Sequence, residues 1–151
     1  MQEAKKFTHD EIAAFMPQQA PFLFLDEAEL CGGEVRGSYT IKGDEFFLKG
    51  HFPNNPVFPA SVMLEALGQL AIIILMKGDF DPQGRHASRE RIFFTSVDGV
   101  RCSRICRPGD KLDLYIKAKR LRHPIGIFEG SISVGGQKTA FAEKISLTFD
   151  F

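Results

Sequence analysis

The stretch GHFPNNPVFPASVMLEALGQL, residues 50–70, contains the two side chains best suited to chemistry. His51 begins a loop that holds three prolines, and Glu65 follows within an otherwise apolar run. Imidazole and carboxyl groups are common general bases and acids, because their pKa values can be tuned toward neutral pH. Together they could remove a proton next to a carbonyl group and help a leaving group depart from the next carbon.

The prolines restrict the chain directly before a predicted helix. Each proline fixes one φ angle, so His51 can be held in a defined position at little entropic cost. The helix starts after Pro59, which leaves the N–H groups of Ala60, Ser61 and Val62 as unpaired donors. Because a helix N-terminus favours negative charge, these donors form a candidate oxyanion site.

Glu65 belongs to a polar stripe on this helix. Ser61, Glu65 and Gln69 are four residues apart and therefore share one face, where Gly68 leaves room beside them. A buried carboxylate must be hydrogen-bonded, paired with a cation or protonated, and the Gln69 amide can donate to it. Spacing alone fits a face toward solvent or a subunit interface equally well, whereas the rigid loop before the helix favours an active site.

The elements that position these residues are a long helix and several strands. The capping box Thr8-His9-Asp10-Glu11 opens a short helix that Pro17 ends, and Gly32-Gly33 joins predicted strands at residues 21–26 and 34–41. The long helix covers residues 60–76 and is apolar nearly all round, so strands must cover it. Four later strands are predicted at residues 91–97, 113–121, 126–134 and 140–149. The predicted fold is α+β, with about six strands around one central helix.

Composition narrows the class of protein further. A length of 151 residues predicts a single domain, residues 1–151. The 19 basic and 19 acidic residues give a formal net charge of zero, which argues against a nucleic-acid binder. The apolar helix is short for a membrane span, which needs about 20 apolar residues, and contains Glu65 and Gln69. The N-terminus lacks a secretory signal, and the three cysteines lack zinc spacing, so reduced thiols in a cytoplasmic protein are expected.

These motifs resemble those of the 3-hydroxyacyl-[acyl-carrier-protein] dehydratases of type II fatty acid synthesis. The family pattern H-F-P-x-x-P-x-x-P-G, followed by E-A-x-x-Q, occurs here as His51-Phe52-Pro53, Pro56, Pro59 and then Glu65-Ala66-Leu67-Gly68-Gln69. Weaker matches are Pro21–Asp26 with the family's PFLLVD, Pro108–Leu112 with its PGDQL, and Ala142-Glu143 in the last strand.

The resemblance implies a hotdog fold, in which a curved antiparallel sheet wraps a long helix. The resemblance implies at least a homodimer, and a hexamer built as a trimer of dimers is the larger alternative. In such a dimer, His51 comes from one subunit of each active site and Glu65 from the other. The substrate is carried on the phosphopantetheine of acyl carrier protein, with no metal or redox cofactor. His51 is expected to take a proton from C2 of the 3-hydroxyacyl thioester, and Glu65 to protonate or hydrogen-bond the C3 hydroxyl. The N–H of Ala60 is expected to polarise the carbonyl, with Ser61 and Gln69 as further substrate-binding residues.

The product implied is trans-2-enoyl-[acyl-carrier-protein], without isomerisation, because members that also isomerise carry aspartate at the position of Glu65. Two departures from the family bear on this expectation. Ala60 stands where the family has glycine. It costs about 1 kcal/mol or more if that position needs a positive φ or a very close backbone approach to the thioester, and nothing if it is an ordinary first helical residue. Gln18-Gln19-Ala20 replaces H-R-Y, which predicts a changed pocket rim or partner surface.

Two further groups of residues have alternative interpretations. Arg101, Arg104 and Arg107 recur every three residues and could dock the acidic carrier protein or form a solvated face. Phe46, Phe47, Phe93 and Phe94 could line an acyl tunnel or pack the core.

Two competing functions remain open on the same fold. The first is a thioesterase in which Glu65 activates water. The second is a catalytically silent acyl-binding or assembly subunit, for which Ala60 is the one hint in the sequence.

Overall fold

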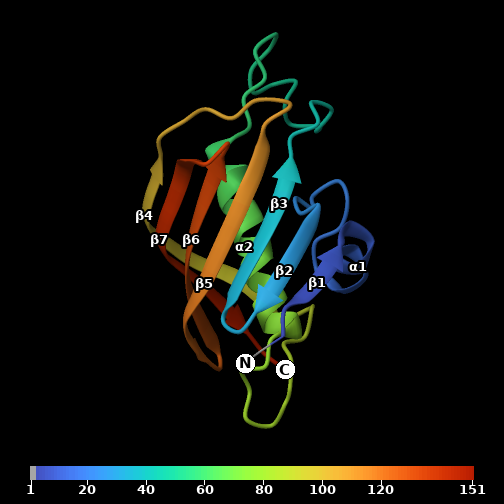
Figure 1. Ribbon diagram of the computed structural model, residues 1–151, viewed down its shortest axis with the longest axis vertical. Coiled ribbons are helices and arrows are strands. Elements are labelled where there is room, and N and C mark those ends of the chain that lie inside the picture. Colours follow the sequence, from blue (N-terminus) through green and yellow to red (C-terminus); the bar gives the residue numbers. More distant parts are fainter. Residues whose placement is uncertain (1–2) are drawn as a thin grey trace.

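The computed structural model describes residues 3–151 and contains a seven-stranded antiparallel sheet curved around one long helix (Figure 1). The elements in chain order are β1 (Lys5–Thr8), α1 (His9–Phe15), β2 (Glu27–Cys31), β3 (Glu34–Thr40), α2 (Ala60–Lys77), β4 (Ile92–Cys102), β5 (Lys111–Arg122), β6 (Ile125–Val134) and β7 (Gln137–Phe149). The strand order is β1-β2-β3-β5-β6-β7-β4. The predicted α+β architecture around a central helix is confirmed.

Helix α2 is the core element that the strands enclose. It starts directly after Pro59, and its side chains from Ala66 to Leu75 are all buried. By length and composition α2 could cross a membrane, and it is the one helix in residues 3–151 of which this is true. Because 61% of that apolar window is buried inside the fold, the helix already has apolar surroundings and acts as the core helix.

The prediction of a strand at residues 21–26 is wrong. This segment is irregular, and the first partner of β3 is β2, which begins at Glu27. Leu23, Phe24 and Leu25 are all buried, so the segment enters the core without the alternation of a strand exposed on one face. The backbone groups of Phe22 and Phe24 bond to the side chain of Gln69 on α2, while the N–H of Asp26 donates to the carbonyl of Ser38 in β3.

Strand β1 was not predicted. It has four mainly exposed residues, Lys5–Thr8, and lies at the edge of the sheet against β2. Such a short polar segment lacks an apolar pattern, so its pairing depends on the hydrogen bonds that β2 offers. The capping box of α1 was predicted correctly: Thr8 accepts from the N–H of Glu11, and Glu11 accepts from the N–H of Thr8.

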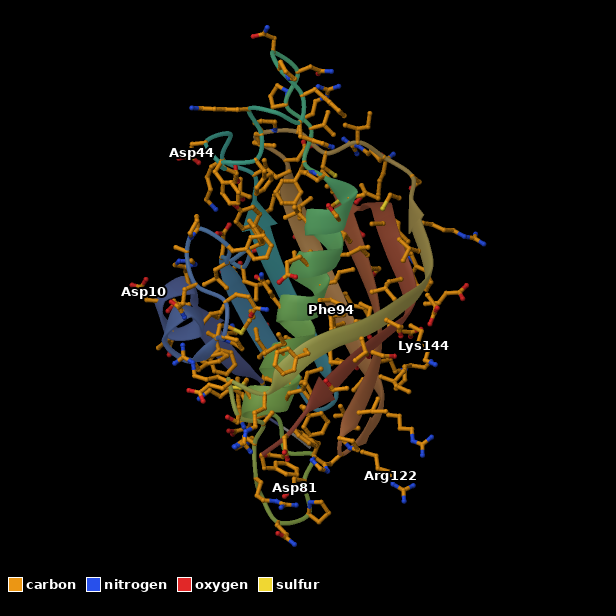
Figure 2. The ribbon with its side chains drawn as sticks, turned by 180° about the vertical axis from the view of Figure 1, so that it is seen from behind. Asp10, Asp44, Asp81, Phe94, Arg122 and Lys144 are labelled. Carbon is orange, nitrogen blue, oxygen red and sulfur yellow. The ribbon has the colours of Figure 1, made fainter. Side chains whose placement is uncertain are left out.

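Strand β4 forms the opposite edge and has nearly all of its side chains exposed. Ile92 and Val97 pack against the core, and the ring of Phe94 lies over α2 (Figure 2). A Cβ atom added at Gly68 would lie 2.2 Å from two carbons of that ring. The room that Gly68 leaves beside Glu65 is therefore occupied by Phe94, while Phe93 is 63% exposed.

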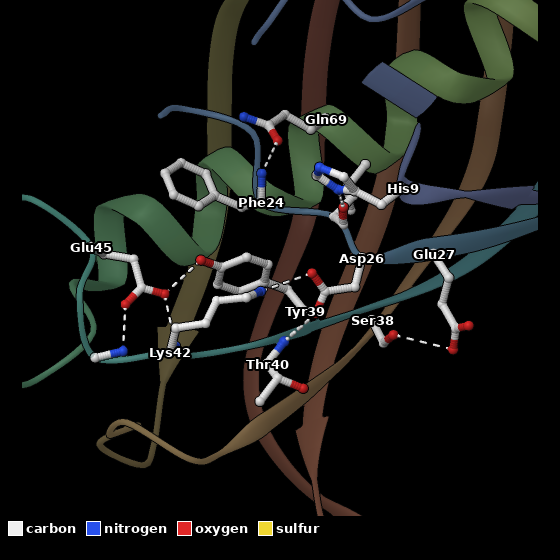
Figure 3. A network of polar contacts seen from close by, with 12 residues as sticks. His9, Phe24, Asp26, Glu27, Ser38, Tyr39, Thr40, Lys42, Glu45 and Gln69 are labelled. Atoms are coloured by element: carbon white, nitrogen blue, oxygen red, sulfur yellow. Dashed lines mark hydrogen bonds and ion pairs between the residues drawn. The ribbon is translucent and has the colours of Figure 1, made fainter. Parts of the chain in front are cut away.

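A polar network fixes the start of the loop between β3 and α2 (Figure 3). The hydroxyl of Tyr39 donates to Glu45 at 2.5 Å, and Glu45 also accepts the backbone N–H groups of Lys42 and Gly43 at 2.9 and 2.7 Å. Burial works to raise the pKa of Glu45, but these hydrogen bonds outweigh it and hold the pKa below its ordinary value. Burial, together with the Glu45 carboxylate, raises the pKa of Tyr39. The loop that leads to His51 is thus anchored to the buried end of β3.

Replacing Tyr39 with phenylalanine should lower the free energy of unfolding by about 1–2 kcal/mol at neutral pH, because Glu45 loses a donor. The folded-state pKa of Glu45 is depressed, so its carboxylate stabilises the fold above the unfolded pKa and this contribution is lost as the pH falls. Urea unfolding should therefore show the difference from wild type shrinking in acid. Tyr115→Phe, which removes an exposed hydroxyl from Glu34, is the matched control with a smaller loss; equal losses would contradict the network.

Gly68→Ala should lower the free energy of unfolding by about 1–3 kcal/mol, because the new methyl group collides with the Phe94 ring. In a Phe94→Ala background the collision is absent, and the better helix propensity of alanine, about 1 kcal/mol, should make Gly68→Ala neutral or stabilising. A double-mutant cycle by urea unfolding measures this coupling. If Gly68→Ala changed the free energy of unfolding equally in both backgrounds, a collision with the Phe94 ring would not be the cause.

Candidate active site

The carboxylate of Glu65 lies half-buried on α2 and is held by two amides. Its Oε2 atom accepts from Nε2 of Gln69 at 2.8 Å and from Nε2 of Gln18 at 3.3 Å. Burial raises the pKa of Glu65, and the two hydrogen bonds only partly oppose this shift. A raised pKa increases the fraction of protonated acid near neutral pH, which suits a group that must donate a proton.

Gln69 is fully buried and uses both ends of its amide. Its Oε1 accepts from the N–H of Phe24 at 2.8 Å, as Figure 3 shows, and its Nε2 donates to the carbonyl of Phe22 at 3.0 Å as well as to Glu65. These contacts hold the backbone of Phe22 and Phe24 on α2, which explains why residues 21–26 do not form the predicted strand. They also fix the amide that orients the Glu65 carboxylate.

The polar stripe of α2 runs from solvent into the core. Ser61 is exposed, Glu65 is half-buried and Gln69 is fully buried. Spacing alone fitted either a solvent-facing stripe or a stripe within an active site. In the single chain Ser61 faces solvent, whereas Glu65 and Gln69 lie progressively deeper.

Ala60 is the first residue of α2 and has a negative φ, since Asn54 is the one non-glycine residue of positive φ among residues 3–151. Alanine is unstrained there, so the positive φ that would have made it costly is absent. The N–H groups of Ala60 and Ser61 make no backbone hydrogen bond within the described chain. The prediction for Val62 is wrong, because its N–H donates to the carbonyl of Pro59 at 3.0 Å in a tight first turn.

His51 belongs to the segment between β3 and α2, and this segment stands beyond the end of the sheet at the top of Figure 1. Its carbonyl accepts from the N–H of Val57 at 2.8 Å, and its Nδ1 lies 2.8 Å from the carbonyl of Val57. Since a carbonyl only accepts, Nδ1 carries a hydrogen, and in the neutral imidazole Nε2 then has the free lone pair that a base requires. The ring also stacks on Phe52 with centroids 4.2 Å apart.

Within residues 3–151 the structure joins Glu65 to Gln69 but makes no hydrogen bond between Glu65 and His51. Gln18 as a partner of Glu65 was missed by the sequence analysis, which expected a changed pocket rim or partner surface at residues 18–20. The two residues are far apart in the chain, and neither local pattern nor spacing relates them. The one available signal was that Gln18 replaces the histidine of the related family.

The three arginines lie at the end of β4 and in the loop that follows it, and all are exposed. Nη1 of Arg107 donates to Oδ1 of Asn55 at 2.5 Å, in the loop of His51. Nη1 of Arg104 donates to the side chain of Gln137 at 3.2 Å. Of the three arginines, Arg107 therefore contacts the loop that presents His51, whereas Arg104 contacts β7.

Comparison with known proteins supports the family that the motifs suggest. A family model described as the FabA-like domain matches residues 16–143. The 3-hydroxyacyl-[acyl-carrier-protein] dehydratase FabZ of Paracidovorax citrulli is 37% identical, with 88% of this chain and 90% of that protein covered. The proteins of the same name from Caulobacter vibrioides and Chloroflexus aggregans are 36% and 32% identical, with 88% and 93% of this chain and 82% and 94% of those proteins covered.

Solved structures share the fold at much lower identity. One chain of the dehydratase heterocomplex ApeI:P from Xenorhabdus doucetiae has a TM-score of 0.58 at 18% identity, covering 77% of this chain and 88% of that chain. The uncharacterized protein PH1136 from Pyrococcus horikoshii has a TM-score of 0.62 at 10% identity, covering 93% and 88%. These likenesses confirm the hotdog fold. From the matched domain and the relatives over most of its length, the chain belongs to the FabA-like family, among the 3-hydroxyacyl-[acyl-carrier-protein] dehydratases named FabZ.

Proposed function

We propose that this protein dehydrates 3-hydroxyacyl thioesters on acyl carrier protein to trans-2-enoyl thioesters, in fatty acid or related acyl-chain synthesis. The observation that carries the proposal is the Glu65 carboxyl group, half-buried with a raised pKa and oriented by two amides. The related FabZ proteins are named for this reaction. The retained His51 and Glu65 supply the two groups that the reaction needs.

In the proposed reaction, Nε2 of His51 takes the proton from C2 of the substrate. The electron pair of the C2–H bond forms the C2–C3 double bond, the C3–O bond breaks, and the hydroxyl leaves as water with a proton from Glu65. The N–H groups of Ala60 and Ser61 at the start of α2 receive the negative charge that develops on the thioester oxygen. Gln69 holds the acid in place from the core.

A complete site in this proposal requires two copies of the chain. His51 and Glu65 share no hydrogen bond within the described residues, and the second copy would bring its His51 to Glu65. Strand β4 supports this, because it is an eleven-residue edge strand with exposed Phe93 and Val100. Long apolar edges of this kind pair with another strand. A homodimer is thus the minimum unit, and a trimer of dimers remains the larger assembly proposed.

The reaction as proposed uses no cofactor bound by this chain, since side chains carry both protons and the phosphopantetheine belongs to the carrier. Residues 3–151 hold no group of three or more His, Cys, Asp or Glu side chains fit for a metal ion. We place the reaction in the cytoplasm. Cys102 and Cys106 form no disulfide, and burial raises the pKa of the Cys106 thiol, which disfavours the reactive thiolate.

His51→Ala and Glu65→Gln should each lower kcat/KM for dehydration at least about 100-fold, because each removes a proton-transfer group. The assay follows the enoyl product and its reverse hydration, and identifies any free acid, which a thioesterase would release. The control variants His123→Ala and Glu90→Gln change exposed residues outside the site and should keep normal turnover. Near-normal activity in His51→Ala or Glu65→Gln would overturn the assignment.

Coexpression of the two inactive chains tests the shared site. If His51 of one copy serves Glu65 of the other, each mixed dimer has one intact site and one doubly altered site. Random pairing should therefore restore about a quarter of wild-type activity. No recovery in isolated mixed dimers would place both groups in one chain, which would refute the two-copy site and leave dehydration itself standing.

Arg101 and Arg104 are proposed to attract the acidic carrier protein. Arg101→Ala/Arg104→Ala should lower kcat/KM on carrier-bound substrate about 10-fold at low salt, and much less at high salt, where exposed charges are screened. Turnover of a short soluble thioester should be unchanged. Arg120→Ala/Arg122→Ala on exposed positions of β5 is the matched control; equal losses on both substrates would contradict docking. Arg107 is kept in this test because it also holds Asn55.

A further inference from the structure

Gln18 carries the one buried side-chain oxygen or nitrogen that lacks a hydrogen-bond partner in residues 3–151, its Oε1 atom. Burying an amide oxygen without a donor costs about 1–3 kcal/mol, so such an atom is normally paired. The same side chain donates from Nε2 to Glu65. An unsatisfied acceptor therefore lies directly beside the group proposed to donate a proton.

The arrangement around Glu65 is asymmetric. Gln18 and Gln69 both donate to Oε2, and no donor from the described chain reaches Oε1 of the carboxyl group. The amide oxygen of Gln18 is bonded to the same carbon as its Nε2, so it belongs to the group that contacts the carboxyl group. Together they offer a ligand one oxygen that can donate a proton and one oxygen that only accepts.

Local folding does not account for Gln18. The neighbouring Gln19 closes the end of α1, because its Nε2 donates to the carbonyls of Ala13 and Met16 at 2.7 and 3.0 Å. Gln18 makes one longer hydrogen bond, at 3.3 Å, and makes it to Glu65 rather than to its own segment. The side chain is directed at the candidate site.

A secondary hydroxyl that leaves as water fits this pair of groups. The hydroxyl oxygen takes the proton from the acid, and the hydroxyl hydrogen needs an acceptor before and after this transfer. The water that forms has two hydrogens, and each needs an acceptor. We propose that Gln18 binds the 3-hydroxyl group of the substrate, with Oε1 accepting the hydroxyl hydrogen and then holding the departing water. This inference rests on the proposed dehydration and adds to it a residue that recognises the leaving group.

The test compares two ligands that differ only in that hydroxyl, 3-hydroxybutyryl-pantetheine and butyryl-pantetheine. Binding is measured by calorimetry in a His51→Ala background, where turnover is blocked. Adding Gln18→Met, which keeps the size of the side chain and removes both polar atoms, should weaken 3-hydroxybutyryl binding about 3- to 10-fold. Butyryl binding should not change. With His51 present, Gln18→Met should lower kcat/KM for dehydration by a similar factor.

Two further variants keep the test decisive. Gln19→Met changes the neighbouring glutamine and should leave the ratio of the two affinities unaltered. Gln18→His should restore the preference for the hydroxylated ligand, because a neutral imidazole also supplies one donor and one acceptor. Equal weakening of both ligands by Gln18→Met, or none, would overturn the role of Gln18. Wild-type protein that binds both thioesters but dehydrates neither would instead overturn the proposed function.

Discussion

The amide of Gln69 is the constraint on which the rest of the structure depends. It is fully buried within an apolar helix, so each of its polar atoms needs a partner there. The backbone of Phe22 and Phe24 supplies two partners and Glu65 the third. One side chain thereby fixes the path of residues 21–26, their position along α2, and the orientation of the carboxylate one turn away.

The candidate site lies where the buried side of α2, whose Gln69 amide has all its hydrogen-bond partners, meets the half-buried Glu65. Burial raises the pKa of Glu65, and its carboxyl group is held on one oxygen only. His51 is held through Nδ1 in a loop that closes on itself by hydrogen bonds between His51 and Val57. Each group is oriented within its own part of the chain, and the exposed edge strand β4 offers the surface on which a second copy would bring them together.

Two departures from the family pattern have different consequences. Ala60 is an ordinary first helical residue of negative φ, so the loss of glycine there carries no backbone strain. Gln18 changes the chemistry beside Glu65, because an amide that does not titrate near neutral pH stands where the family has histidine. The segment expected to differ at a pocket rim or partner surface thus includes a residue that contacts the acid itself.

The sequence by itself determined the long central helix, the capping box of α1, the later strands and the candidate pair of His51 and Glu65, because these follow from local periodicity, capping chemistry and a continuous motif. Only the tertiary structure decided that residues 21–26 are irregular, that Phe94 fills the space over Gly68, and that Gln18 reaches Glu65. Each of these depends on a contact between residues distant in sequence, where a buried polar group or a small residue determines which neighbour can approach. Such a contact leaves no local pattern in either segment.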